Sequence, residues 1–201
     1  MKLVGSFTSP YVRKVRVALI EKQISHDFVN DPPWGADSHV TDYNPLGKVP
    51  ALITDNGDVL FDSTILLEHI ELLNAAPALL PSDKKAALQV KQLVILADGI
   101  TDAGVSVLLE SRRPPEKQSS DWVARQHAKI ERGLAALDAR VAGKTWLHGN
   151  MFSAADIAAG CMLFWLEFRL PQINWRKYPA LADLSGRLAV RPSFVQTIPH
   201  D

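Results

Sequence analysis

The sequence predicts an α/β domain with βαβ-ββα order and a mixed sheet, followed by an all-α helical bundle domain. Strand and helix patterns alternate through residues 1–77, whereas residues 84–201 carry only helical periodicity. The stretch between them, 78–83, mixes polar and apolar residues around a proline, which suits a linker. A chain of 201 residues is long enough for one compact domain with a second packed against it.

The first domain is predicted to open with a strand, a helix and a second strand. Lys2–Phe7 is a short apolar run, and Tyr11–Lys22 carries apolar side chains at helical spacing. Ile24–Asn30 alternates in polarity as a strand does. A helix between two strands in this order forms a right-handed crossover, and the two strands it joins are parallel neighbours. Residues 31–47 hold three prolines and two glycines, so they should form mostly loop, with one helical turn near Val40.

The second half of this domain is predicted to be a hairpin followed by a helix. Val49–Thr54 and Asp58–Phe61 are apolar runs joined by a turn with an Asn-Gly step, the strongest short-range hairpin signal in the chain. Asp62 and Ser63 then stand where a helix N-cap belongs, and the helical pattern continues to Asn74. An antiparallel hairpin beside a parallel pair makes the sheet mixed.

Helical periodicity recurs throughout the second domain. The predicted helices are Lys84–Arg112, Ser120–Val141, Ile157–Leu166 and Ala180–Val190. The third of these is apolar on nearly every face, so it should form the core of the domain. Ser153 and Asp156 precede it in the spacing of a capping box, which indicates a buried folding motif at its start rather than a pair of catalysts.

Composition and charge exclude several classes of protein. The 22 basic and 22 acidic residues cancel, so the net charge recruits neither nucleic acid nor an anionic membrane. The single cysteine, Cys161, excludes an intramolecular disulfide and is expected to be a small core residue. Six histidines without ligand spacing argue against a metal site. The N-terminus lacks a signal-peptide pattern and Ile157–Leu166 is too short to span a bilayer, so we expect a cytoplasmic protein without a membrane partner.

The first turn between strand and helix carries Ser9-Pro10-Tyr11-Val12. With the βαβ-ββα order, this turn resembles that of the thioredoxin fold, which normally holds Cys-Pro-Tyr-Cys. Both cysteines are absent here, so disulfide exchange, which needs a thiolate and a resolving thiol, is not available at this turn. A serine hydroxyl can instead bind the sulfur of a bound thiol.

Further motifs recur along the chain in the order in which one family carries them. They are Ser9-Pro10 before Arg13-Lys14-Val15-Arg16, then Asn44-Pro45-Leu46-Gly47-Lys48-Val49-Pro50, Phe61-Asp62-Ser63, the segment from Gly149 to Ile157, Tyr178-Pro179-Ala180-Leu181 and Arg191-Pro192-Ser193-Phe194. With these motifs the chain resembles the cytosolic glutathione transferases over essentially its whole length, and most resembles small bacterial members with a catalytic serine. The resemblance implies glutathione as co-substrate, an apolar electrophile as second substrate, and a homodimer.

The resemblance makes Ser9 the catalytic residue, and physical chemistry supports that role. Its hydroxyl can donate to a sulfur anion, while the N-terminus of the helix adds partial positive charge. Lowering a thiol pKa by two units needs about 2.7 kcal/mol, and a helix terminus contributes up to ~2 kcal/mol. A hydrogen bond to a charged group contributes about 1.5 to 3 kcal/mol, so the two effects together suffice. The alternative is that Ser9 is only the helix cap.

The resemblance also assigns residues that bind glutathione. Val49-Pro50 corresponds to the family's cis-proline site, where the backbone of Val49 would pair with the cysteinyl backbone; the alternative is an ordinary trans proline at a strand start. Ser63 would take the γ-glutamyl carboxylate, with Asp62 near the ammonium, and both can also serve as N-cap. Lys48 could reach the glycyl carboxylate, or be a solvated loop lysine.

Other residues are weaker candidates. Tyr11, Trp34 and Trp165 could line the apolar co-substrate pocket that the family has between its domains, or simply pack. The basic residues at 13, 14 and 16 are expected to form a solvated face or an inter-domain contact, with a glutathione contact less favoured. In the dimer that the resemblance implies, the helix Lys84–Arg112 would line the interface, and Asp98 or Asp102 could reach the neighbouring γ-glutamyl ammonium.

Four functions are compatible with the resemblance. Attack of the glutathione thiolate on an electrophilic carbon is favoured, with glutathione-dependent reduction of a peroxide as its alternative. A non-catalytic binding or stress-regulatory protein is disfavoured, because Ser9, Val49-Pro50 and Asp62-Ser63 retain the residue types needed to hold a tripeptide thiol. Isomerisation of a small dicarboxylic acid, as in zeta-type relatives, ranks last because their serine-serine-cysteine turn is missing.

Overall fold

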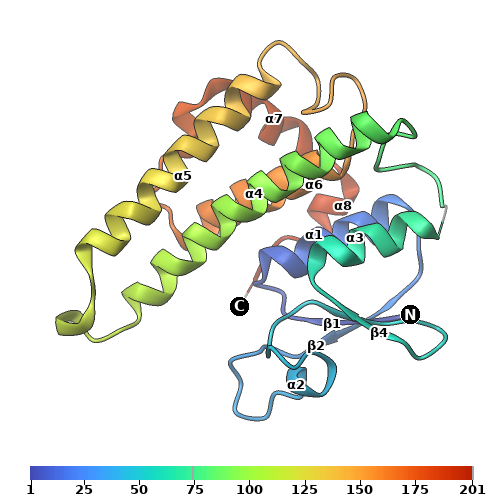
Figure 1. Ribbon diagram of the computed structural model, residues 1–201, viewed down its shortest axis with the longest axis horizontal. Coiled ribbons are helices and arrows are strands. Elements are labelled where there is room, and N and C mark those ends of the chain that lie inside the picture. The colour runs from blue at the N-terminus through green and yellow to red at the C-terminus, as the bar shows by residue number, and fades with distance from the viewer. Residues whose placement is uncertain (74, 201) are drawn as a thin grey trace. The chain divides into compact units, whose positions relative to one another are not determined.

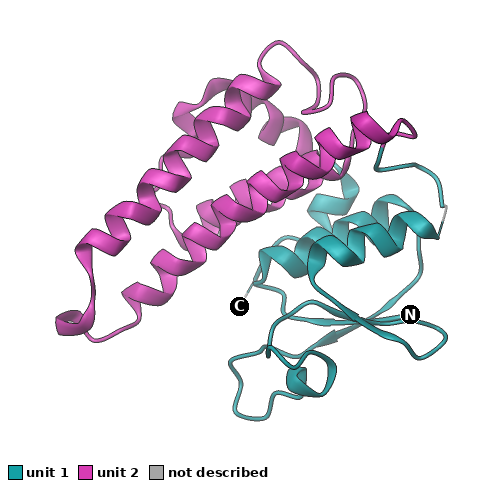
Figure 2. Ribbon diagram, viewed as in Figure 1, with its two compact units in different colours: residues 1–80, 190–201 teal, residues 81–189 magenta. Residues whose placement is uncertain are grey.

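The computed structural model describes residues 1–73 and 75–200, and the chain divides into two compact units. The first unit contains residues 1–80 together with the C-terminal residues from Val190 onward, and the second contains 81–189 (Figure 2). The predicted domain at 84–201 did not separate that C-terminal stretch, which belongs with the first unit in the structure. The predicted helix end at Asn74 lies outside the described residues.

The first unit is built on a four-stranded mixed sheet of order β2-β1-β3-β4 (Figure 1). Its strands are β1 (Lys2–Gly5), β2 (Asp27–Asn30), β3 (Ala51–Ile53) and β4 (Val59–Phe61). As expected, β1 pairs with β2 in parallel, while β3 is antiparallel to both β1 and β4. The βαβ-ββα order and the mixed sheet are therefore confirmed.

Helices cover both faces of this sheet. Helices α1 (Pro10–Glu21) and α3 (Ser63–Leu72) pack together on one face, and the short α2 (Val40–Tyr43) lies on the other (Figure 1). Val40 contacts the fully buried Val4 and Ala51 of the sheet. A Cβ atom at Gly5 would lie 2.5 Å from Val12. Only glycine therefore allows the first turn of α1 to lie this close to the end of β1.

The second unit is mostly helical, as predicted, with two isolated β-bridges within residues 146–151. The helices are α4 (Lys84–Ser111), α5 (Ser120–Val141), α6 (Ala154–Arg169) and α7 (Pro179–Ala189), with 3₁₀ turns η1 (Pro115–Lys117) and η2 (Trp175–Lys177). Helix α4 packs against both α5 and α6. Helix α6 is buried over most of its length and runs three residues beyond the predicted end, so the apolar segment forms the core of this unit.

The start of α6 is enclosed. Ser153 and Asp156 form the predicted capping box, and both residues are 0% exposed. The carboxylate of Asp156 accepts hydrogen bonds from the Leu147 amide at 2.8 Å and from both the amide and the hydroxyl of Ser153 at 2.9 Å. The motif therefore joins the preceding loop to the helix by a fully buried set of polar contacts.

One described helix, α4, meets the length and composition criterion for a membrane span. Its buried side chains include Val90, Val94, Ala97 and Ile100. Because α4 packs against α5 and α6, this apolar stripe is accounted for by the core of the second unit.

Candidate functional site

The sheet register brings three predicted site segments to one edge of the first unit. Ala51 of β3 pairs with Val4 on one side and with Phe61 on the other. Val49 and Pro50 directly precede Ala51. If the strand pairing continues past Ala51, these two residues lie between the segment that follows β1 and the segment that follows β4. The segment after β1 leads to Ser9, and the segment after β4 is Asp62-Ser63.

Two helices begin at this same edge, α1 after Ser9 and α3 after Asp62. Each helix N-terminus has amide groups without an intrahelical partner and carries partial positive charge. The edge is therefore suited to negatively charged groups of a ligand. The loop that contains Trp34 leaves β2 here too, since the parallel pairing puts Asn30 opposite Gly5.

Ser9 is the N-cap of α1. Its backbone is extended, and its half-buried side-chain oxygen accepts a hydrogen bond of 3.3 Å from the Val12 amide. A serine hydroxyl can accept this bond and still donate its own proton. The capping role and the thiolate-binding role, which the sequence posed as alternatives, are therefore compatible in one side chain.

The loop before β3 presents Lys48 and Val49. The Val49–Pro50 peptide bond is cis, as the family resemblance implied. Asn44, which is 2% exposed, donates from Nδ2 to the Lys48 carbonyl at 2.8 Å and accepts from the Leu46 amide at 3.0 Å. Asn44 was expected only as part of the motif that leads to Pro50, although an Asn-Pro step is a recognised signal for a turn held by the asparagine side chain.

Asp62 and Ser63 form the start of α3. The Asp62 carboxylate accepts hydrogen bonds from the amides of Thr64 at 2.8 Å and Ile65 at 3.3 Å. Asp62 has φ of +74°, a conformation that L-residues other than asparagine and aspartate rarely adopt. Its side chain is exposed, whereas Ser63 is buried at 5%. An exposed cap with positive φ is typical of a ligand-binding position.

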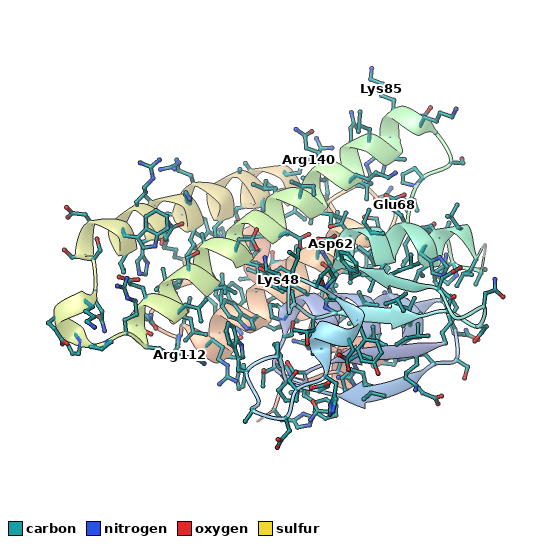
Figure 3. The ribbon with its side chains drawn as sticks, turned by 60° about the horizontal axis from the view of Figure 1, so that its bottom comes forward. Lys48, Asp62, Glu68, Lys85, Arg112 and Arg140 are labelled. Carbon is teal, nitrogen blue, oxygen red and sulfur yellow. The ribbon has the colours of Figure 1, made fainter. Side chains whose placement is uncertain are left out.

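Lys48 and Asp62 supply opposite charges at this edge of the first unit (Figure 3). Lys48 is exposed and lies two residues before Pro50, which precedes the pair formed by Ala51 and Phe61, while Asp62 follows that pair on the other strand. A zwitterionic ligand can therefore meet a cation on one side of Val49 and an anion on the other.

The basic residues of α1 are not a solvated face. Arg13 is 4% exposed and Lys14 is 1% exposed, which corrects that expectation. Arg13 donates from Nη2 to the Phe194 carbonyl at 3.1 Å and from Nε to the Thr197 hydroxyl at 3.3 Å. Burial, and to a smaller extent the charge of Arg13, lowers the pKa of Arg16. The spacing of these basic residues on the helix did not predict their burial, because their partners are distant in the sequence.

The three aromatic candidates differ in their surroundings. Tyr11 is half-buried in the first turn of α1, and Trp34 is 74% exposed. Trp165 belongs to α6 of the second unit, is 4% exposed, and packs so closely on α4 that a Cβ atom at Gly104 would lie 2.8 Å from its ring. Cys161 is buried in the same helix, as expected of a core residue.

Helix α4 carries the two acidic candidates. Asp98 is half-buried and Asp102 is exposed. Among the described residues, no group of three or more histidine, cysteine, aspartate and glutamate side chains is arranged to hold a metal ion.

Two family models match the chain. The model for the glutathione S-transferase N-terminal domain matches residues 8–73, and the model for the C-terminal domain matches 120–187. An uncharacterized GST-like protein of Escherichia coli K12, YibF, is 44% identical over 99% of this chain and 98% of its own length.

Solved structures of glutathione S-transferases are also similar to this chain. A glutathione S-transferase from Methylobacillus flagellatus with glutathione bound has a TM-score of 0.96 at 41% identity, and 99% of each chain is covered. A glutathione S-transferase from Methylobacterium radiotolerans in complex with glutathione sulfonate has a TM-score of 0.95 at 39% identity, over 100% of this chain and 95% of the other.

Proposed function

This chain belongs to the glutathione S-transferase family, and we propose that its first unit binds glutathione at the sheet edge and ionises the thiol at Ser9. The protein is a glutathione transferase with glutathione as co-substrate. The observation that carries the site proposal is the register around Ala51, because it gathers Ser9, Val49 and Ser63 beside two helix N-termini.

Each part of glutathione has a partner of matching chemistry. The γ-glutamyl carboxylate meets the hydroxyl and the backbone amide of Ser63 at the start of α3, and its ammonium meets the exposed Asp62 carboxylate. The peptide groups of the cysteinyl residue pair with the backbone N–H and C=O of Val49. Lys48 neutralises the glycyl carboxylate. These contacts leave the sulfur at the start of α1.

The chemistry at Ser9 is activation of a nucleophile. The thiol proton leaves to solvent, and the Ser9 hydroxyl and the α1 N-terminus stabilise the remaining thiolate. The sulfur then forms a bond to an electrophilic carbon while the bond to the leaving group breaks, and the leaving group takes the electron pair. Hydroperoxides are the alternative acceptor: the thiolate forms an S–O bond while the O–O bond breaks and the alcohol leaves, and a second glutathione then displaces water from the sulfenic acid to give glutathione disulfide.

The second substrate and the assembly are proposals that rest on the resemblance to the family. We propose an apolar electrophile for which the half-buried Tyr11 and the exposed Trp34 of the first unit are the candidate contacts, whereas Trp165 is buried in the core of the second unit. We also propose a cytoplasmic homodimer with α4 at its interface. Asp98 or Asp102 of one protomer would then approach the γ-glutamyl ammonium in its partner. Sedimentation as a monomer at micromolar concentration would reject the dimer.

The function is tested by binding and turnover on the wild-type protein. Titration calorimetry with glutathione, and assays with chlorodinitrobenzene, other electrophiles and cumene hydroperoxide, separate the candidates. Turnover of electrophiles supports the transferase, and preferential turnover of hydroperoxides supports the peroxidase. Tight glutathione binding without turnover would support the non-catalytic alternative. Absence of glutathione binding would overturn the site proposal.

A further inference from the structure

The C-terminal residues Arg191–His200, called the strap below, contact α1 and the loop before it. The short helix α8 (Pro192–Val195) lies within the strap and packs against α1 (Figure 1). The strap and α1 belong to the same compact unit. The strap makes three sets of contacts, and later residues of the strap contact earlier residues of the first unit. The strap therefore runs antiparallel to α1, from the last residue of that helix to the loop that contains Ser9.

The first contact holds the end of α1. Arg191 and Glu21 form a bidentate ion pair with distances of 2.9 Å and 2.6 Å, and the Ser193 hydroxyl donates to the same carboxylate. Burial by itself would raise the pKa of Glu21, but the hydrogen bonds from Arg191 and Ser193 and the charge of Arg191 outweigh it and lower the pKa. The strap is therefore anchored at this point by charge-assisted bonds.

The second contact lies in the first turn of α1. Arg13 hydrogen-bonds to the Phe194 carbonyl and the Thr197 hydroxyl, and its guanidinium lies 5.5 Å from the centre of the Phe194 ring. Thr197 also donates to the Ser193 carbonyl at 2.7 Å. These buried bonds keep the strap on the helix up to the residues that adjoin Ser9.

The third contact reaches the loop that contains Ser9. The ring of His200 stacks on Phe7, with centroids 4.4 Å apart and an interplanar angle of 29°. Phe7 also contacts Phe28 of β2 at 4.9 Å, and the Arg16 guanidinium lies 5.2 Å from Phe7 and 4.7 Å from Phe28. Phe7, two residues before Ser9, is thus held between the sheet, α1 and the strap.

We propose that the strap is a positioning element for the catalytic turn, in which His200 acts through Phe7 to hold the Ser9 hydroxyl at the thiol. Two hydrogen bonds of this loop are long: 3.3 Å from the Ser9 amide to the Ser6 carbonyl, and 3.4 Å between the Ser6 and Thr8 hydroxyls. The aromatic stack therefore adds a restraint on the side of the loop where these two bonds are weak. The catalytic half of this proposal rests on the proposed function of Ser9.

The test compares His200→Ala with His200→Phe and with Gln196→Ala in the full-length protein. His200→Phe keeps a ring to stack on Phe7, and Gln196→Ala is a matched control at an exposed position of the strap. The readouts are kcat and KM for glutathione, the pH dependence of bound thiolate from its ultraviolet absorbance, and amide hydrogen exchange of residues 6–12.

We expect His200→Ala to lower kcat and the thiolate fraction near neutral pH about fivefold, which corresponds to about 1 kcal/mol. KM for glutathione should change less, exchange of residues 6–12 should become faster, and His200→Phe should restore all three. Gln196→Ala should match wild type.

If His200→Ala has the same pH profile and the same hydrogen exchange as wild type, the positioning role is wrong. Catalysis by the wild-type protein would still support the proposed function in that case. Lack of rescue by His200→Phe would also overturn the ring-stacking account. If wild-type protein binds glutathione without ionising it, the proposed function fails and the catalytic role of the strap fails with it. Faster exchange of residues 6–12 in His200→Ala would then report only a structural contact.

Discussion

The helix starts of the two units use the same kinds of capping side chain in opposite environments. At α6, Ser153 and Asp156 are fully buried, and the Asp156 carboxylate accepts three hydrogen bonds from the protein. At α1 and α3, Ser9 is half-buried and Asp62 is exposed. A cap whose acceptors are all used inside the protein stabilises the fold, whereas a cap that retains accessible polar groups can also bind a ligand.

The largest expected effect is on the buried cap. Asp156→Ala removes the acceptor for the amides of Leu147 and Ser153 and for the Ser153 hydroxyl, and each unsatisfied buried donor is costly. We expect the free energy of unfolding to fall by about 3 kcal/mol. Denaturant unfolding measures it, with the exposed first-turn residue Asp121→Ala of α5 as control. An unfolding midpoint equal to wild type would show that the start of α6 is solvated.

The second effect concerns catalysis at the open cap. Ser9→Ala removes the hydroxyl that stabilises the thiolate, so kcat/KM should fall about 30-fold, which is about 2 kcal/mol. Glutathione affinity should change much less, because the hydroxyl acts chiefly on the ionised sulfur. Ser9→Thr retains the hydroxyl and should keep more activity. Equal losses of affinity and turnover in Ser9→Ala would indicate a structural cap only.

The third effect is on affinity at Asp62. Asp62→Asn keeps an oxygen acceptor for the Thr64 and Ile65 amides and tolerates positive φ, but it removes the negative charge. The dissociation constant for glutathione should rise about fivefold, or about 1 kcal/mol, with the unfolding free energy nearly unchanged. Calorimetry on this variant and on the exposed control Asp58→Asn decides the point; equal affinities in both would remove Asp62 from the site.

The smallest effect is a pH dependence of the buried cap. Burial raises the pKa of Asp156 above its ordinary 3.8, although hydrogen bonds from Leu147 and Ser153 oppose the shift. Because the folded state binds this proton more tightly than the unfolded state, the stabilisation is full below pH 3.8 and is lost as pH rises through the folded pKa.

Asp156→Asn does not titrate, so it provides the reference for this dependence. The unfolding free energy of wild type minus that of Asp156→Asn should decrease with rising pH and then level off. Urea unfolding at a series of pH values measures the difference. A difference that increases with pH would mean that the carboxylate is stabilised, not destabilised, by its surroundings.

Local patterns predicted most of the elements because they depend on neighbouring residues. The helix Ser120–Val141 has the predicted bounds, and Arg112 is the C-cap of α4, one residue beyond its end. The capping box of Ser153 and Asp156 and the hairpin turn before Asp58 also formed as expected. In contrast, β2 begins at Asp27 rather than Ile24, since a strand extends only as far as its partner β1 provides hydrogen bonds.

In the candidate site, too, the residue types were predictable from the sequence, whereas their arrangement was not. Ser9, Val49-Pro50 and Asp62-Ser63 were identified from motifs, but the motifs did not say that they lie near one another; the pairing of Ala51 with Val4 and Phe61 brings the segments that carry them to one edge of the sheet. Asn44 was part of a motif, yet its hydrogen bond to the Lys48 carbonyl appears only in the folded loop.

The sequence by itself determined the fold class, the caps and the residue types of the catalytic turn, because periodicity and capping act over a few residues. Only the tertiary structure decided that Arg13 and Lys14 are buried and that Glu21 pairs with Arg191. It likewise decided that His200 stacks on Phe7. Such contacts join residues almost a chain length apart, and their stability depends on desolvation and geometry that arise only when the chain is folded.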